Sequence, residues 1–295
     1  MASVKEIKNR IGSIQDTMKI TNAMYMISSS KMQRAKRKLA ETEPFFFAQQ
    51  DAIARMIQLS PDVKSDYFGR EEKAKEDRVR GYVVITGDKG LAGAYNMNVI
   101  KLAMEKLGES KNNKLFSIGE TGRHYFESHG VNIDENFRYT VQDPNLYRAR
   151  EITSFLLEQY ESGELDEIHI VYTKMINAFR MDATTFQLLP MEKDSFHTME
   201  DSTSSVGSEV VEFHPSLKYV LENLIPNIVT GNMYGVLVES YTSEHNSRMM
   251  AMQTATDNAK EILHDLGIMY NRVRQAAITQ EITEVIAGAK AQKNK

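Results

Sequence analysis

The sequence has 295 residues, of which 41% are hydrophobic and 26% are charged, with a net charge of −4. This composition is typical of globular material with room for about two domains, and it excludes a disordered tail. The absence of cysteine excludes disulfides, thiolate zinc sites and cysteine nucleophiles. No stretch approaches the ~20 apolar residues that span a bilayer, and the first residues lack the apolar core of a signal peptide. We therefore expect a soluble, cytoplasmic chain that reaches a membrane only through a partner.

The charge is distributed unevenly along the chain. Residues 1–40 have a net charge of +7 and residues 241–295 of +1, so residues 41–240 have a net charge of −12. A basic end attached to an acidic middle predicts that the end contacts an acidic partner surface. Nucleic acid is not expected as that partner, because the whole chain is acidic and its basic run lacks interleaved aromatic residues.

Residues 1–60 are expected to form one long helical domain. Apolar residues recur there at alternating spacings of three and four, which is the seam of a coiled coil: Val4, Ile7, Ile11, Ile14 and Met18, then Met32, Ala35 and Leu39. Between these two groups, Thr21 and Ser28 occupy seam positions. The apolar stripe is therefore expected to drift or broaden toward Ile20, Met24 and Ile27. Pro44 is expected to kink the helix near Glu43, and the helix resumes to about Leu59.

Residues 78–210 are expected to form a central α/β domain. Four segments have strand patterns, at 81–86, 115–118, 168–172 and 184–189, and helical stretches lie between them at 96–107, 122–129 and 147–161. Strands that alternate with helices predict a partly parallel sheet with helices on its faces. The hydrophilic stretches 62–78 and 192–209 are typical of a linker and a mobile loop.

Residues 211–295 are expected to form a second helical domain, with one helix from about Pro226 to Gly288, roughly 90 Å long at 1.5 Å per residue. Its predicted seam alternates small and large residues, which lets two helices approach closely: Ala255, Ala259, Ile262, Leu266, Met269, Val273 and Ala276. Gly267 interrupts this pattern at a cost of about 1 kcal/mol relative to alanine. Each terminal helix exposes an apolar stripe, so we expect the two to pair.

A glycine-rich turn, Gly87 to Gly93, follows a predicted strand and precedes a predicted helix, where phosphate-binding loops occur. Its spacing, G-x-x-G-x-x-G, matches neither the dinucleotide fingerprint nor the P-loop, and no Lys-Ser/Thr pair follows it. We favour a structural turn over a nucleotide site. The seven histidines form no H-x-H or H-x-x-x-H pair and no G-x-S-x-G occurs, so neither a metal site nor a serine hydrolase is expected.

Two helical segments are candidate partner-binding sites. Five basic residues fall within about two turns and suit either a solvated face or an acidic partner loop: Lys31, Arg34, Lys36, Arg37 and Lys38. Near the end of the chain, polar residues from Arg274 to Glu281 give way to apolar residues that continue to within ten residues of the terminus: Ile278, Ile282, Val285 and Ile286. An exposed, fraying end does not need these apolar residues, so we expect another protein to enclose this tip.

At these residues the sequence resembles the gamma subunit of the F-type rotary ATP synthase, in its bacterial form. The resemblance rests on three blocks, Val4 to Met32, Thr86 to Asn96 and Ser243 to Gly288, which together span the chain. The departures are small: Gly87-Asp88-Lys89 stands where the family more often has Ser-Asp-Arg, Gly267 replaces a larger residue, and Ala287 replaces Gly or Ser. Chloroplast relatives have a cysteine-bearing insertion, which is absent here, so thiol control is not expected.

The resemblance implies an antiparallel coiled coil of the two terminal helices plus a central Rossmann-like α/β domain. It implies a central rotor shaft, one copy per complex, inside a ring of alpha and beta subunits, with its base against the epsilon subunit and the c-subunit ring at the cytoplasmic face of the membrane. Proton-driven rotation would change the catalytic beta subunits in turn, and ATP hydrolysis would drive the reverse. Arg274, Gln275 and Thr279 match positions that meet a beta-subunit catch loop, and the basic run 31–38 would face acidic beta-subunit loops. No catalytic residue and no cofactor is expected.

Two other functions compete with the rotor shaft. A Rossmann-like nucleotide-binding protein with a coiled-coil extension would need the phosphate-loop spacing that this sequence does not have. A coiled-coil adaptor or chaperone would not require the specific residues of the tip at 274–286.

Overall fold

The computed structural model describes residues 3–70, 73–74, 77–109, 112–196 and 212–293. The chain divides into two compact units, which we call the coil unit (Met1–Ser28 with Arg248–Lys295) and the sheet unit (Ser29–Ser247). Two long helices, α1 (Val4–Leu59) and α5 (Leu217–Lys293), have residues in both units. Each unit therefore contains a part of both terminal helices.

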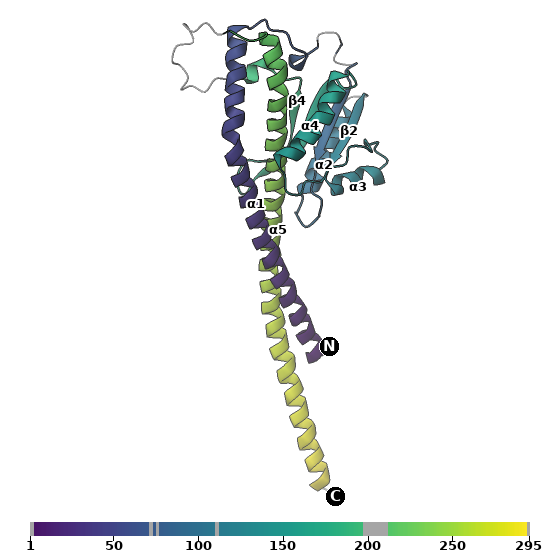
Figure 1. Ribbon diagram of the computed structural model, residues 1–295. Helices are drawn as coiled ribbons and strands as arrows, with labels where there is room; N and C mark the ends of the chain where they lie inside the picture. The colour runs from purple at the N-terminus through teal and green to yellow at the C-terminus, as the bar shows by residue number, and fades with distance from the viewer. Residues whose placement is uncertain (1–2, 71–72, 75–76, 110–111, 197–211, 294–295) are drawn as a thin grey trace. The chain divides into compact units, whose positions relative to one another are not determined.

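In the coil unit, the beginning of α1 lies beside the part of α5 that follows Arg248, and the two helices run in opposite directions (Figure 1). Ile7 is buried, and Val4, Ile11, Ile14 and Met18 are half-buried. The predicted α1 seam is thus confirmed in this unit. The antiparallel coiled coil forms because both helices remove an apolar stripe from water by pairing.

The seam of α1 stays in its heptad register past Met18, because Thr21 and Ser28 are buried. The expected shift of the stripe is wrong for Ile20 and Ile27, which are exposed, and the stripe broadens only to Met24, which is half-buried. The Thr21 hydroxyl lies 2.7 Å from that of Thr256 on α5 and also donates to the carbonyl of Met18 at 3.0 Å. Hydroxyls that are satisfied in this way can replace apolar groups in a seam at little cost.

The predicted seam of α5 is correct at four of its seven positions and wrong at the other three. Ala259 and Leu266 are buried and Ala255 and Val273 are half-buried, as expected. Ile262 and Met269 are 45% and 48% exposed and Ala276 is also exposed, while their C-terminal neighbours are half-buried: Leu263, Tyr270 and Ala277. Both registers alternate spacings of three and four through apolar residues, so only the position of α1 decides between them.

The sheet unit contains a four-stranded sheet of β1 (Arg80–Ile85), β2 (Asn113–Ile118), β3 (Glu167–Met175) and β4 (Met181–Leu189), in the order β2-β1-β3-β4. The first three strands in this order are parallel, and β4 is antiparallel to β3. The predicted strands and the partly parallel sheet are confirmed. Mostly apolar strands are required here because both faces of the sheet are covered.

Helices cover the two faces as the alternation of elements predicts. On one face, Tyr82 and Val84 of β1 pack in a cluster with α2 (Tyr95–Gly108) and α3 (Glu120–Ser128). On the other face, Val83 and Ile85 pack in a larger cluster with α4 (Leu146–Glu161) and with α5 from Leu221 to Tyr241. The sheet unit is therefore a Rossmann-like layered α/β fold in which part of α5 belongs to the core.

The start of α5 lies earlier than the sequence predicts. The helix begins at Leu217 and continues through Pro226 to Lys293. Leu221 and Ile225, which precede the proline, are buried in the core. Their burial stabilises the first turns against the missing proline amide. Helix α1 likewise runs through Pro44 as one element, so the kink expected near Glu43 does not interrupt it, and it ends at Leu59, as expected.

Buried polar contacts attach α5 to the sheet at residues 240–246. Ser240 accepts a hydrogen bond at its carbonyl from the Tyr95 hydroxyl at 3.1 Å. The Ser243 hydroxyl donates to the carbonyl of Thr173 at 3.2 Å, and the Asn246 amide donates to that of Ala178 at 2.7 Å. These bonds reach the Tyr95 side chain of α2 and the backbone of β3 and of the turn after it, which fixes α5 both along and around its own axis within the sheet unit.

The segment 62–78 is not a plain linker in its described residues. It contains a short 3-10 helix, η1 (Asp66–Phe68), in which Tyr67 is buried. The Tyr160 hydroxyl of α4 donates to the carbonyl of Asp66 at 2.7 Å. Of the expected loop at 192–209, the structure describes only the first residues, including η2 (Lys193–Ser195); the rest lies outside the described residues.

Candidate partner-binding surfaces

The coil unit ends in a single helical tip. The Thr21–Thr256 contact fixes the pairing of the antiparallel helices, so Val4, the first residue of α1, lies opposite α5 near Val273. Val273 and Ala277 are the last half-buried residues of α5, and every side chain from Ile278 to Lys290 is exposed. Figure 1 shows the C-terminus well beyond the N-terminus along this helix pair. The tip therefore has no covering partner within its own unit.

Two rows of side chains run along this tip. One row is apolar, with Ile278, Ile282 and Ile286 four residues apart and Val285 beside them, the last 72% exposed. The adjacent row is polar: the Thr279 hydroxyl donates to the carbonyl of Gln275 at 2.9 Å, and the Thr283 hydroxyl to that of Thr279 at 2.7 Å. Water penalises an exposed isoleucine row on a solvated helix, so this pattern suits a surface that another protein covers.

The three residues predicted to meet a catch loop lie at the base of the tip. Arg274, Gln275 and Thr279 are all exposed. Gln275 and Thr279 are one helical turn apart in the polar row, and Arg274 begins the row that continues with Ile278. No ion pair involves Arg274 within the described ranges, so its guanidinium is available to a carboxylate or a backbone carbonyl of a partner.

The basic run of α1 lies in the sheet unit, and the structure does not bring its five residues together on one face. Lys31, Arg34 and Arg37 are exposed. Lys38 forms an ion pair with Asp143 at 3.0 Å, and the Lys36 ammonium donates to the Met175 sulfur at 3.6 Å. Only Lys38 is therefore neutralised within the chain, and the charges of the other four residues remain for a partner.

The glycine-rich turn packs against α5. The amide of Gly87 donates to the Asn96 side chain at 2.7 Å, and a Cβ at Gly87 would lie 2.8 Å from the carboxyl carbon of Glu244. Asp88 accepts backbone N–H groups from Glu120 and Val141, both at 3.2 Å. The Glu244 side chain occupies the space beside Gly87, and the Asp88 oxygens close the turn onto its neighbours. This geometry suits a structural turn.

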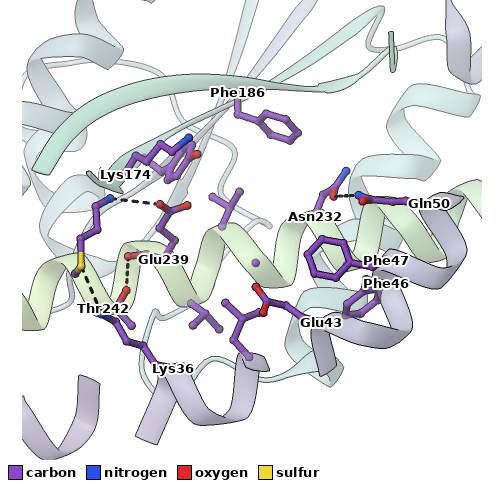
Figure 2. Close-up of a pocket in the computed structure, with 17 residues that line it drawn as sticks. Lys36, Glu43, Phe46, Phe47, Gln50, Lys174, Phe186, Asn232, Glu239 and Thr242 are labelled. Atoms are coloured by element: carbon purple, nitrogen blue, oxygen red, sulfur yellow. Dashed lines mark hydrogen bonds between the residues drawn. The ribbon is translucent and has the colours of Figure 1, made fainter. Parts of the chain in front are cut away.

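The sheet unit also contains a cavity of about 590 Å³, which we call the Glu239 cavity (Figure 2). Its walls come from α1, from β3 and β4, and from α5 at residues 231–242. Burial raises the pKa of the Glu239 carboxyl, although the Met175 amide, which donates to it at 3.3 Å, and the charge of Lys174 act in the opposite direction. The sequence analysis missed this cavity. A four-residue repeat of Gly231, Gly235 and Glu239 along α5 was its only sequence signal.

The described part of the chain has neither a metal-ligand cluster nor a membrane-spanning helix. Nowhere in it do three or more His, Asp or Glu side chains cluster as metal ligands would. None of its helices combines the length and apolarity that crossing a membrane requires.

Comparison with known proteins gives a consistent result. Residues 3–292 match the family described as ATP synthase. The ATP synthase gamma chain of Ruminiclostridium cellulolyticum is 43% identical over 98% of both chains. A gamma chain described as sodium ion specific, from Acetobacterium woodii, is 37% identical over 98% of both chains.

Solved structures share the fold. A chain in the Euglena gracilis mitochondrial ATP synthase, in a structure of its OSCP, F1 and c-ring, superposes with a TM-score of 0.64, covering 98% of this chain and 94% of that chain at 15% identity. Another, in the rotor of the same complex, gives a TM-score of 0.60 at 14% identity. The combination of two long terminal helices with a small mixed sheet is thus a known architecture.

Proposed function

This chain belongs to the family of ATP synthase gamma chains and is the rotor shaft of that complex, and we propose that its tip turns inside a ring of alpha and beta subunits. The proposal rests on the exposed apolar row Ile278, Ile282, Val285 and Ile286. Enclosing one such side chain yields on the order of 1.5–3 kcal/mol. A ring around the tip would supply the burial that α1 does not.

Arg274, Gln275 and Thr279 form the contact with a beta-subunit catch loop. The support is positional: all three are exposed on α5 next to the apolar row. A rotor must engage its bearing at one angle and release it at the next, which favours a few directional polar contacts over a continuous apolar seal. Arg274 is suited to this because its guanidinium forms strong bonds to carboxylates that depend on geometry.

The basic run of α1 forms a second, weaker contact with acidic beta-subunit loops. Lys31, Arg34, Lys36 and Arg37 make this contact, whereas Lys38 already pairs with Asp143 in the sheet unit. Exposed charges of this kind favour encounter and register more than affinity, and salt screens them.

At its base the chain binds the epsilon subunit and the c-subunit ring, with one copy per complex at the cytoplasmic face of the membrane. It reaches the membrane only through these partners. Within the sheet unit, the contacts of Ser240, Ser243 and Asn246 with the sheet support this role, because a torque on the α/β fold must pass into α5 without slipping. Torque applied there then follows the continuous backbone of α5.

The chain contributes no catalytic residue and binds no nucleotide. Glu244 beside Gly87 and the two backbone bonds to Asp88 support a structural role for the glycine-rich turn. Rotation alters the catalytic beta subunits through contact alone, and they perform the chemistry. A Rossmann-like nucleotide-binding protein is the alternative, and saturable ATP or ADP binding by the isolated chain would favour it.

Reconstitution tests the proposal. Purified alpha and beta subunits are mixed with and without the chain, and steady-state ATP hydrolysis is measured at equal beta-subunit concentration. We expect sustained hydrolysis only with the chain present. Equal hydrolysis in both mixtures would contradict the proposal, and so would a ring that assembles without binding the chain.

A further inference from the structure

The Glu239 cavity has the size and composition of a small-molecule site. Its volume of about 590 Å³ lies within the roughly 300–1,000 Å³ that is typical of ligand pockets. Four aromatic rings line it, and Figure 2 shows Phe46 and Phe47 of α1 on its side and Phe186 of β4 above; Tyr172 of β3 completes the set. An aromatic wall favours an apolar body or a cation over a strongly hydrated anion.

Two glycines of α5 line the cavity, and they differ in the space beside their Cα atoms. A Cβ at Gly235 would meet nothing within 4 Å, whereas a Cβ at Gly231 would lie 2.3 Å from the ring of Phe46. Gly231 therefore allows α1 and α5 to approach closely, a role unrelated to a ligand. Gly235, one turn further along α5, leaves space above the helix that a larger side chain would fill.

The charges of the cavity are arranged with the carboxylates inside. Glu43 of α1 and Glu239 of α5 are half-buried lining residues, while Lys36 and Lys174 are exposed. In Figure 2 Glu239 points from α5 toward β3, and Glu43 extends from α1 toward α5. Neither carboxylate takes part in an ion pair within the described ranges, and the Lys36 ammonium donates instead to the Met175 sulfur. A half-buried carboxylate without a cationic partner loses hydration that a bound cation would offset.

We propose that the Glu239 cavity binds an amphipathic ammonium, a molecule with one cationic nitrogen on an aromatic or alkyl body. The nitrogen pairs with Glu239, with Glu43 as the second nearby charge, and the body packs on Phe46, Phe186 and Tyr172. An acidic ligand is disfavoured because the half-buried charges are negative. Every lining residue lies in the sheet unit, so the site is separate from the tip on which the proposed ring contact rests.

Calorimetric titration of the isolated full-length chain with 4-phenylbutylammonium tests the site. We expect saturable binding of one molecule per chain. The matched neutral probe, 4-phenylbutan-1-ol, keeps the body and removes the charge, and it should bind at least about tenfold more weakly, the factor that corresponds to 1.4 kcal/mol. Absence of saturation by the ammonium, or equal affinity for the alcohol, would overturn the proposal.

Three variants locate the binding. Glu239→Gln removes the charge and should weaken binding about tenfold, while Glu261→Gln makes the same change on an exposed part of α5 and should leave it unchanged. Gly235→Leu fills the cavity without removing a polar group and should abolish binding; leucine also favours the helix, so this variant still tests the site if Glu239→Gln unfolds. Circular dichroism establishes folding. Wild-type affinity in both cavity variants would place the ligand elsewhere and refute the assignment.

Discussion

The coil unit and the sheet unit differ in what covers their apolar residues. In the sheet unit, side chains such as Phe116, Ile152 and Ile170 are fully buried by neighbouring elements of the same unit. In the coil unit, α5 buries Met252, Ala259 and Leu266 but leaves the isoleucine row of the tip exposed. The difference teaches that the sheet unit covers its own apolar residues, whereas the end of the coil unit leaves a row that only another protein can cover, which the proposed function assigns to the ring.

The largest expected effect on stability separates the two units directly. Phe116→Ala removes a ring that contacts those of Phe137 and Phe155 in the core, and it should cost about 3–5 kcal/mol. Ile282→Ala, at an exposed position of the tip, should cost less than about 0.5 kcal/mol. Urea unfolding of the isolated chain, followed by circular dichroism, measures both. Comparable losses would mean that the tip is packed in the free chain.

The isoleucine row of the tip should contribute to binding of the alpha and beta subunits, although it contributes little to the stability of the isolated chain. A variant with serine at Ile278, Ile282 and Ile286 should unfold like the wild type when isolated, but it should bind the alpha and beta subunits at least about tenfold more weakly because apolar burial is lost. Native gel titration measures the affinity. The control variant places serine at Glu261 and Asp265, which are exposed on the same helix. Equal losses in the two variants would remove the special role of the apolar row.

A smaller effect is expected from the polar contact beside that row. Arg274→Gln removes the guanidinium and keeps a polar side chain, so the complex should assemble normally. ATP-driven proton pumping per ATP hydrolysed should fall, by up to about tenfold if a charged hydrogen bond is lost. Pumping and hydrolysis are measured on the same membrane vesicles. Reduced assembly with an unchanged ratio would count against the catch contact.

The smallest expected effect is a gain in stability. Gly267 lies inside the continuous helix α5, and a Cβ there would meet nothing within 4 Å. Gly267→Ala should therefore stabilise the isolated chain by about 1 kcal/mol. Differential scanning calorimetry compares it with Gly231→Ala, which should destabilise because its Cβ would overlap Phe46. A loss of stability in Gly267→Ala would show that the glycine is needed within its own unit.

Much of this fold follows from local patterns in the sequence. The strands and helices of the sheet unit could be predicted because their apolar residues form short continuous runs, as at 81–86, or recur every three to four residues, as at 147–161. The seam of α5 could not be predicted in the same way, because Ile262 and Leu263 are both apolar and only the partner helix decides which of them is covered. The sequence predicts the start of α5 too late, at Pro226. The helix begins earlier because Leu221 and Ile225 are buried against other elements, which local sequence does not reveal.

The candidate sites were predictable to different degrees. The tip could be predicted from its isoleucines, which continue where a helix end would ordinarily become polar. The structure leaves those isoleucines exposed. The basic run appeared as one patch because Asp143 and Met175, which engage Lys38 and Lys36, are more than a hundred residues away in the sequence. The Glu239 cavity was missed for the same reason: its walls come from three distant segments.

The central claim is that this chain rotates relative to the alpha and beta subunits. Because the chain has no cysteine, Lys101→Cys, at an exposed position of α2, gives a unique attachment point for an optical probe. With the alpha and beta subunits immobilised, the account predicts continuous rotation of the probe in one direction when ATP is added, and none with ADP. Complexes that hydrolyse ATP while the probe stays fixed would contradict it.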